Sequence, residues 1–231
     1  MSLNQEQQSQ IDFQLENHKH SRYEVDIVLT DGKVLKNFTI LPDVFRSDKM
    51  PALFLAKWLF FNNGLYKDKR VLDLGCGSGI QGIVCAFYGA SKVVFSDIAI
   101  ESAQNTKINI KKYGLDEISK IYQGDLFEKI NERFDIIIFN QPPFPIEPIV
   151  DIRVSVSMLG GVELIKRFFK EVSGYLNKGG IIIMPYVHIA GPENDPYLRA
   201  PEFGYNVEKV FEMDIETHFK KGLMTICKIW K

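Results

Sequence analysis

One short segment limits the fold of this chain more than any other: residues 71–79 read as a buried strand that ends in a glycine-rich loop. Val71, Leu72 and Leu74 fit a parallel strand that is covered on both faces, and a helical pattern of apolar residues begins directly after the loop. Glycines at alternate positions permit backbone angles closed to other residues and let a ligand approach the main chain. This order predicts an α/β fold with a nucleotide-like ligand at the turn, although a glycine turn that only joins strand to helix has the same pattern.

The loop can be read in two registers that imply different cofactors. Gly77, Gly79 and Gly82 spell G-x-G-x-x-G, and Asp97 follows at the spacing of a dinucleotide-binding fingerprint. The other register starts at Asp73 and reads D-x-G-x-G-x-G. Burial of a carboxylate inside an apolar strand is unfavourable unless the carboxylate is satisfied. The second register gives Asp73 a polar role, whereas the dinucleotide register leaves it unexplained.

Composition bounds the class of protein. A chain of 231 residues with 45% hydrophobic content suits one large α/β domain. Its net charge of −1 gives no overall cationic field of the kind that drives association with nucleic acid. The three cysteines lack zinc-site spacing, so no metal is expected, and they favour a reducing, cytoplasmic compartment. No apolar run approaches the ~18 residues of a membrane span, and the glutamine-rich N-terminus is expected to be frayed.

The rest of the chain continues the α/β order. Asp31 and Gly32 between two β-rich runs are a strong signal for an N-terminal β-hairpin over residues 23–40. Periodicity predicts helices over 51–62, from 80, over 100–113 and after 160, strands over 92–97, 118–123, 134–139 and 181–184, and two closing strands over 206–213 and 223–231 that a segment over 214–222 joins.

Two further acids stand where predicted strands end. Asp97 closes the strand over residues 92–97, and Asp125 follows Gly124 after the next strand. A carboxylate can accept from both vicinal hydroxyls of a ribose, which suits Asp97 to that role. Asp97 could instead cap the helix that begins near residue 99. Together with Asp73, these acids lie at the ends or edges of three consecutive strands, and the dinucleotide register does not explain that pattern.

These motifs resemble those of the class I S-adenosylmethionine-dependent methyltransferases, in particular their small-domain group. The resemblance divides the chain into an N-terminal extension with its hairpin, 1–40, and a methyltransferase domain, 41–231. It implies S-adenosylmethionine as the cofactor, with Asp97 on the ribose and Asp125 on the adenine amino group. Phe45 matches a segment that covers the cofactor in this group, although it could equally pack the start of the next helix. The implied cofactor contacts are Phe45, Asp73, Gly75, Cys76, Gly77, Gly79, Asp97, Ile98, Asp125, Leu126 and Asn140.

A second motif follows the strand over residues 134–139. Asn140-Gln141-Pro142-Pro143-Phe144 resembles the (Asn/Asp)-Pro-Pro-(Tyr/Phe) motif of methyltransferases that modify a planar nitrogen. The lone pair of such a nitrogen is delocalised. A side-chain oxygen and a rigid backbone carbonyl that accept its N–H groups favour attack on the methyl group, while an aromatic ring stacks on its plane. Gln141 is inserted relative to the motif, so either Asn140 or Gln141 can fill the acceptor role. The alternative is a proline-rich loop that merely ends the strand.

The sequence therefore predicts an α/β, Rossmann-like class I methyltransferase fold: a seven-stranded, mostly parallel sheet with helices on both faces, plus an N-terminal β-hairpin. The predicted activity is transfer of a methyl group from S-adenosylmethionine to a planar nitrogen of an RNA base, a protein glutamine or a small molecule. A non-catalytic binding protein of the same fold and an NAD(P)-linked oxidoreductase stay open as alternatives. Neither a metal nor a membrane partner is expected.

Overall fold

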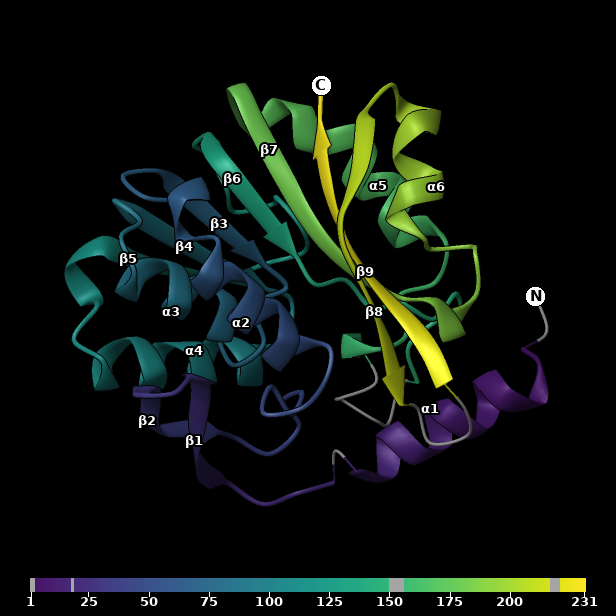
Figure 1. Ribbon diagram of the computed structural model, residues 1–231, viewed down its shortest axis with the longest axis horizontal. Helices are drawn as coiled ribbons and strands as arrows, with labels where there is room; N and C mark the ends of the chain where they lie inside the picture. The colour runs from purple at the N-terminus through teal and green to yellow at the C-terminus, as the bar shows by residue number, and fades with distance from the viewer. Residues whose placement is uncertain (1–2, 18, 150–155, 217–220) are drawn as a thin grey trace.

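The computed structural model describes residues 3–17, 19–149, 156–216 and 221–231 (Figure 1). Helices and strands alternate along most of the chain. Their bounds are α1 Gln5–Asn17, β1 Tyr23–Thr30, β2 Lys33–Ile40, α2 Ala52–Phe61, β3 Arg70–Leu74, α3 Ile80–Phe87, β4 Lys92–Asp97, α4 Ile100–Lys112, β5 Ser119–Gln123, β6 Phe134–Phe139, α5 Glu163–Glu171, β7 Leu176–Val187, α6 Pro196–Arg199, β8 Asn206–Glu216 and β9 Lys221–Trp230. Short 3-10 helices lie at Asn63–Leu65 (η1), Asp116–Ile118 (η2), Val172–Gly174 (η4), His188–Ala190 (η5) and Ala200–Phe203 (η6).

Seven strands form the central sheet in the order β5-β4-β3-β6-β7-β9-β8. The strands from β5 to β7 pair in parallel, and β9 pairs antiparallel with both β7 and β8. The chain builds outward from β3 in one direction and then returns to place β6 on its other side. A ligand crevice forms at such a switch point, outside the carboxyl ends of the strands. The predicted seven-stranded sheet with its antiparallel closing pair is confirmed.

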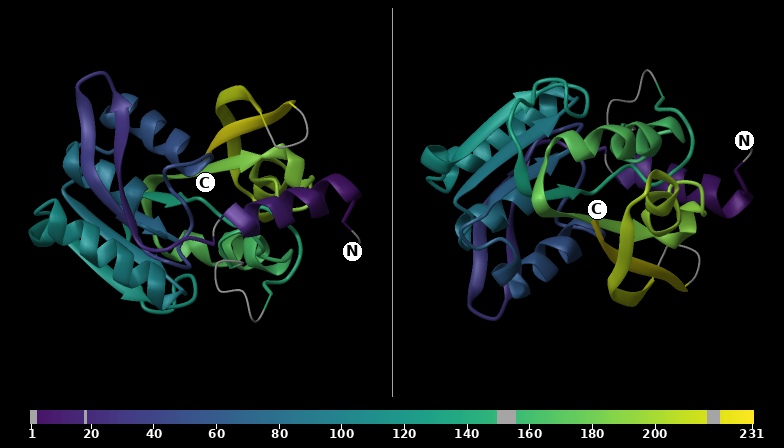
Figure 2. Two further views of the ribbon diagram at one scale, coloured as in Figure 1. Left: turned by 90° about the horizontal axis from the view of Figure 1, so that it is seen from below. Right: turned by 90° about the horizontal axis from the view of Figure 1, so that it is seen from above.

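The central strands β3, β4 and β6 are buried on both faces. Neighbouring residues of a strand point to opposite faces. Val71 belongs to a core that includes α2, α3 and the hairpin. Leu72 and Leu74 belong to a second core with α5 on the other face. Figure 2 shows helices on both sides of the sheet. The apolar run of β3 is therefore the signature of a strand with no solvated face.

The N-terminal hairpin packs into the same core as the sheet. Phe38 is fully buried there, and Asn109 of α4 holds the hairpin by its side-chain amide. Asn109 accepts from the N–H of Thr39 at 3.0 Å and donates to the carbonyls of Thr39 and Ser78 at 2.9 and 3.0 Å. One buried amide thus ties the hairpin to the glycine loop. The division of the chain at residues 40 and 41 stays a prediction.

The expectation of a frayed N-terminus is wrong, because residues 5–17 form α1. Ile11 and Leu15 are buried against Phe144 and its neighbours, and such packing stabilises a short helix more than intrinsic propensity does. In Figure 1, α1 lies beyond the carboxyl ends of the central strands.

The seventh strand is longer than predicted. β7 begins at Leu176 and continues to Val187, because β9 pairs with it as far as that residue. Gly179 and Gly180 precede the predicted strand over 181–184 and lie within β7, where its pairing with β6 shifts register. Of the predicted joining segment over 214–222, residues 217–220 lie outside the described residues.

Candidate active site

The glycine loop between β3 and α3 borders a cavity at the carboxyl ends of the central strands. Gly75, Gly77 and Gly79 have φ angles of +64°, +56° and +85°, a region that other residues rarely adopt. The N–H groups of Gly75 and Cys76 donate to the carbonyl of Ser96 on β4, at 2.8 and 3.1 Å. A Cβ on Gly77 would meet no atom within 4 Å. The loop therefore leaves its main chain open to a ligand.

Asp73 lies behind this loop and is absent from the cavity lining. Its side chain is 2% exposed, and its Oδ2 accepts from the N–H of Gly82 in α3 at 2.8 Å. A Cβ on Gly82 would overlap the ring of Phe95, so glycine is needed for α3 to pack on β4. Burial raises the pKa of Asp73 to about 8. Asp73 thus holds α3 against the loop, and its contact with the cofactor stays a prediction. Gly79 is also outside the lining and caps the start of α3.

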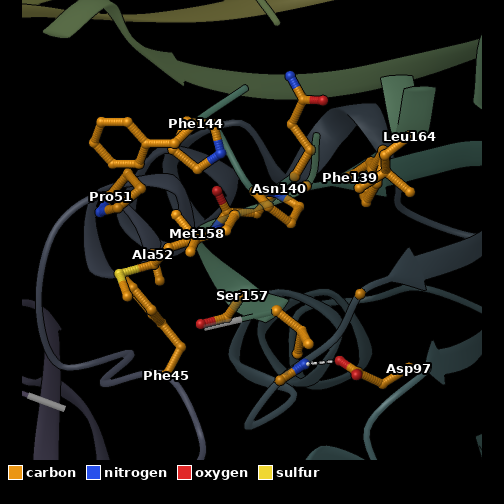
Figure 3. A pocket seen from close by; sticks show the side chains of 18 of the residues that line it. Phe45, Pro51, Ala52, Asp97, Phe139, Asn140, Phe144, Ser157, Met158 and Leu164 are labelled. Carbon is orange, nitrogen blue, oxygen red and sulfur yellow. Dashed lines mark hydrogen bonds between the residues drawn. The ribbon is translucent and has the colours of Figure 1, made fainter. Parts of the chain in front are cut away.

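Asp97 is the acid most firmly placed at the cavity. It is 9% exposed. Its Oδ2 accepts from the N–H of Gly77 at 2.9 Å (Figure 3), and its Oδ1 accepts from the N–H of Ala99 at 2.9 Å. Burial raises the pKa of Asp97, and these two backbone donors oppose that shift. Asp97 therefore fixes both the glycine loop and the start of α4, and its carboxylate also accepts from the side chain of Ser102 and from the N–H of Ile98.

The predicted adenine-side residues line the same cavity. Asp125 follows Gly124 after β5, and its Oδ2 accepts from Nη2 of Arg167 on α5 at 2.6 Å. Ile98 is 55% exposed and Leu126 is buried, and both lie on the lining. The Asp125 carboxylate is thus shared between Arg167 and any ligand that reaches it.

Two amide side chains of the motif after β6, Asn140 and Gln141, line the cavity, and they differ in their hydrogen bonds. Asn140 is half-buried on the lining, and no hydrogen bond joins its side chain to another described residue. Gln141 is 4% exposed, and its Nε2 donates to the carbonyl of Asn194 at 2.6 Å. Pro142 and Pro143 follow on the lining. Gln141 is therefore held in place by the protein, whereas no such hydrogen bond to a described residue fixes the Asn140 side chain.

Two aromatic rings border the cavity at different places. Figure 3 shows Asn140 with Phe144 on one side and Asp97 on the other, and Phe45 apart from both. Phe144 is 4% exposed, because Ile11 and Leu15 of α1 pack in the same cluster. Phe45 lines the cavity and also packs against the core, so the cofactor-covering role and the packing role are compatible in space.

The cavity has a volume of about 450 Å³. It brings together every predicted site residue except Asp73 and Gly79. The predicted residues on its lining are Phe45, Gly75, Cys76, Gly77, Asp97, Ile98, Asp125, Leu126, Asn140, Gln141, Pro142, Pro143 and Phe144.

Several lining residues escape sequence analysis. Gln10 and Gln14 reach the cavity from α1, and Arg167 reaches it from α5. Arg167 carries no local signal, because only the fold brings it to Asp125. A spacing of four between Ile11 and Leu15 is the only hint of an apolar face on α1.

The described part of the chain lacks two features, a metal-binding cluster and a membrane-spanning helix. Within it, no group of three or more His, Cys, Asp or Glu side chains could hold a metal ion. None of its helices is long and apolar enough to cross a membrane.

The sequence matches the methyltransferase small domain family over residues 37–191. It is 32% identical over 148 residues to a Methanocaldococcus jannaschii protein named as a protein N5-glutamine methyltransferase, covering 62% of this chain and 73% of the relative. It is 31% identical over 126 residues to the release factor glutamine methyltransferase of Borreliella burgdorferi, covering 50% of this chain and 44% of the relative. The fold resembles the 16S rRNA N2 G1207 methyltransferase of T. Thermophilus, solved with AdoMet and guanosine: the TM-score is 0.58 and the identity 22%, over 89% of this chain and 50% of that one.

The fold and the family match define an S-adenosylmethionine-dependent class I methyltransferase. The chain belongs to the methyltransferase small domain family. The site fits its cofactor, since the glycine loop leaves the space that a Cβ on Gly77 would enter, and carboxylates stand beside it at Asp97 and Asp125. The dinucleotide and non-catalytic interpretations are not favoured.

Proposed function

We propose that the chain methylates a planar nitrogen, and that this nitrogen is the side-chain amide of a glutamine in a protein. The observation that carries the proposal is the Asn140 carboxamide, which lines the cavity directly after β6 and makes no hydrogen bond to the rest of the described chain. The names of the two relatives that are glutamine methyltransferases support the same acceptor.

In this proposal, Asn140 accepts an N–H of the substrate amide through its side-chain oxygen. S-adenosylmethionine supplies an electrophilic methyl group when it is bound. An amide nitrogen attacks poorly while its lone pair is delocalised, so acceptors held on both N–H groups favour the reactive geometry. Pro142 and Pro143 restrict the backbone, and a carbonyl of this rigid segment would accept the second N–H. The proton leaves late, so no strong base is required before transfer.

Gln141 takes a positioning role in this proposal. Its Nε2 donates to the carbonyl of Asn194 on the segment after β7. This hydrogen bond fixes the motif loop against that segment. The inserted residue therefore lengthens the loop without removing Asn140 from the position after the strand. Cys76 also lines the cavity, but burial and the nearby Asp97 carboxylate raise the pKa of its thiol. A protonated thiol does not serve as a nucleophile.

The cofactor contacts are proposed on the same geometry. Asp97 would accept the ribose hydroxyls, and Asp125 would accept the adenine amino group beside Arg167. Gly75, Gly77 and Cys76 would lie against the methionine part. We also propose a cytoplasmic location, because all three cysteines are free and buried.

The test is methyl transfer from labelled S-adenosylmethionine into separated protein and RNA fractions of a cell lysate, followed by mass spectrometry of digests. The expected product is N5-methylglutamine in the protein fraction. Label confined to RNA, or to small molecules, would overturn the glutamine assignment. The variant Asn140→Ala should abolish most of the protein label, whereas Asn131→Ala, an exposed asparagine outside this cavity, should retain it.

A further inference from the structure

The described residues that line the cavity include more acidic than basic side chains. Four acids line it outside the glycine loop and the adenine side: Asp43 between the hairpin and α2, Glu147 in the motif loop, Glu163 at the start of α5, and Glu216 at the end of β8. Glu163 pairs with Lys166 at 2.7 Å. The other three are exposed, and none of them forms an ion pair with a described residue. Arg167 is the one Lys or Arg among the described lining residues, and Asp125 already pairs with it. Among the described residues, the lining of the cavity therefore carries more negative than positive charge.

Buried amide oxygens in the same lining lack donors. Gln10 of α1 is 6% exposed and Gln141 is 4% exposed. The Oε1 atoms of both have no hydrogen-bond partner in the described part of the chain. A buried acceptor without a donor raises the free energy of the state in which it occurs. The acceptor end, defined here as the lining formed by Gln10, Asn140, Gln141, Phe144, Glu147 and Met158, thus has an excess of acceptors.

We infer that the partner presents its acceptor glutamine on a cationic segment, with Lys or Arg close to the glutamine in sequence or in space. This inference rests on the proposed function and adds the chemistry of the partner. Side chains of Lys and Arg supply only donors and positive charge, which matches unpaired carboxylates and donor-poor amides. A phosphate backbone would instead bring negative charge against Asp43, Glu147 and Glu216, so the same lining disfavours RNA.

Electrostatic complementarity mainly raises the rate of association and the selectivity between partners. Both effects weaken as the salt concentration rises. The experiment uses the full chain and synthetic peptides that contain one glutamine flanked by Lys and Arg, by Ser, or by Glu. Methyl transfer is measured as kcat/KM at low and high salt. Binding of the same peptides is measured by calorimetry in the presence of the demethylated cofactor. At low salt, we expect kcat/KM for the basic peptide to exceed that for the acidic peptide by about tenfold or more. This ratio of kcat/KM values should fall as the salt concentration rises.

A charge-neutralised variant ties this preference to the three acids. Asp43→Asn, Glu147→Gln and Glu216→Gln combined should remove most of the preference and leave cofactor affinity unchanged. The matched control combines Asp31→Asn, Asp116→Asn and Glu117→Gln, three exposed acids outside the cavity, and should keep the preference.

The outcomes separate the inference from the function on which it rests. Equal binding and transfer for basic and acidic glutamine peptides would overturn the inference and leave the proposed function in place. Transfer into RNA with no binding of any glutamine peptide would overturn both. If basic peptides bind more tightly and the preference disappears in the charge-neutralised variant, the inference is supported even where short peptides turn over slowly.

Discussion

The two ends of the cavity differ in how well the protein satisfies its own polar groups. At the cofactor end, formed by the glycine loop and the strand-end acids, backbone donors meet acceptors: Gly77 donates to Asp97, and Gly82 donates to Asp73. At the acceptor end, the Oε1 atoms of Gln10 and Gln141 are buried without a donor in the described structure. The cofactor end is thus preorganised by the fold, whereas the acceptor end keeps buried acceptor atoms whose donors do not come from the described residues.

This contrast predicts which kinetic quantity each end controls. Groups that meet the substrate only in the reacting geometry change kcat, and groups that meet the cofactor change its dissociation constant. Variants at the two ends should therefore change different quantities.

The largest effect is expected at Asn140. Asn140→Ala should lower kcat by about 10²–10³, because it removes an acceptor that acts mainly in the transition state. Its cofactor affinity should change less than about threefold, because the proposed role of the Asn140 side chain is to accept from the substrate amide. Single-turnover methyl transfer and calorimetry with the demethylated cofactor measure the two quantities. Gln141→Ala should cost less, since Gln141 acts through the loop; a larger loss at Gln141 would assign the acceptor role to that residue.

A smaller effect, on binding, is expected at Asp97. Both of its oxygens accept from backbone N–H groups, and an amide can replace only one of them as an acceptor. Asp97→Asn should weaken cofactor binding about 10-fold, and Asp97→Ala about 100-fold, because hydrogen bonds to a charged group contribute about 1.5–3 kcal/mol each. If Asp97 were only a cap for α4, Asp97→Asn would bind cofactor as the parent does, and both variants would change thermal stability alone.

Sequence analysis succeeds at the cofactor end for a physical reason. The loop needs left-handed backbone at Gly75, Gly77 and Gly79. Its conformation can therefore be predicted from the types of a few neighbouring residues. It fails at the acceptor end, where position depends on contacts between distant segments. Gln141 bonds to a carbonyl 53 residues away, and nothing in either local pattern indicates that pairing.

The helix α1 shows the same limit. Two buried apolar residues and a polar remainder do not distinguish a docked helix from a frayed terminus, because the contacts that decide the matter lie on Phe144 and the segment after β7. The central sheet could be predicted because each buried strand carries its own apolar run. The extent of β7 could not, since the partner strand β9 sets it.

Within the cofactor end, Asp73 predicts a pH dependence of stability. Burial raises its pKa from 3.8 to about 8 in the folded chain. A raised folded pKa favours the native state below the unfolded pKa, and this contribution is lost as pH rises through about 8. The unfolding free energy of the cofactor-free protein should therefore fall between pH 5 and pH 8, by at most about 1.4 kcal/mol per pH unit from this group.

Urea unfolding of the parent and of Asp73→Asn at several pH values measures this dependence. The variant cannot ionise at this position, so its stability should fall less steeply than that of the parent. Asp116→Asn changes an exposed carboxyl and should follow the parent. Identical slopes for the parent and Asp73→Asn would mean that the folded carboxyl keeps an ordinary pKa.

The smallest effect on global stability is expected from the helix that closes the acceptor end. Leu15→Ala should lower the global unfolding free energy by less than about 1 kcal/mol, because a terminal helix can open without unfolding the sheet. Leu59→Ala in the core beside β3 should cost about 2–5 kcal/mol. Hydrogen exchange should show lost protection over residues 5–17 in Leu15→Ala alone. If Leu15→Ala instead destabilises the whole chain as much as Leu59→Ala does, α1 folds as one unit with the sheet. The acceptor end would then be as preorganised as the cofactor end.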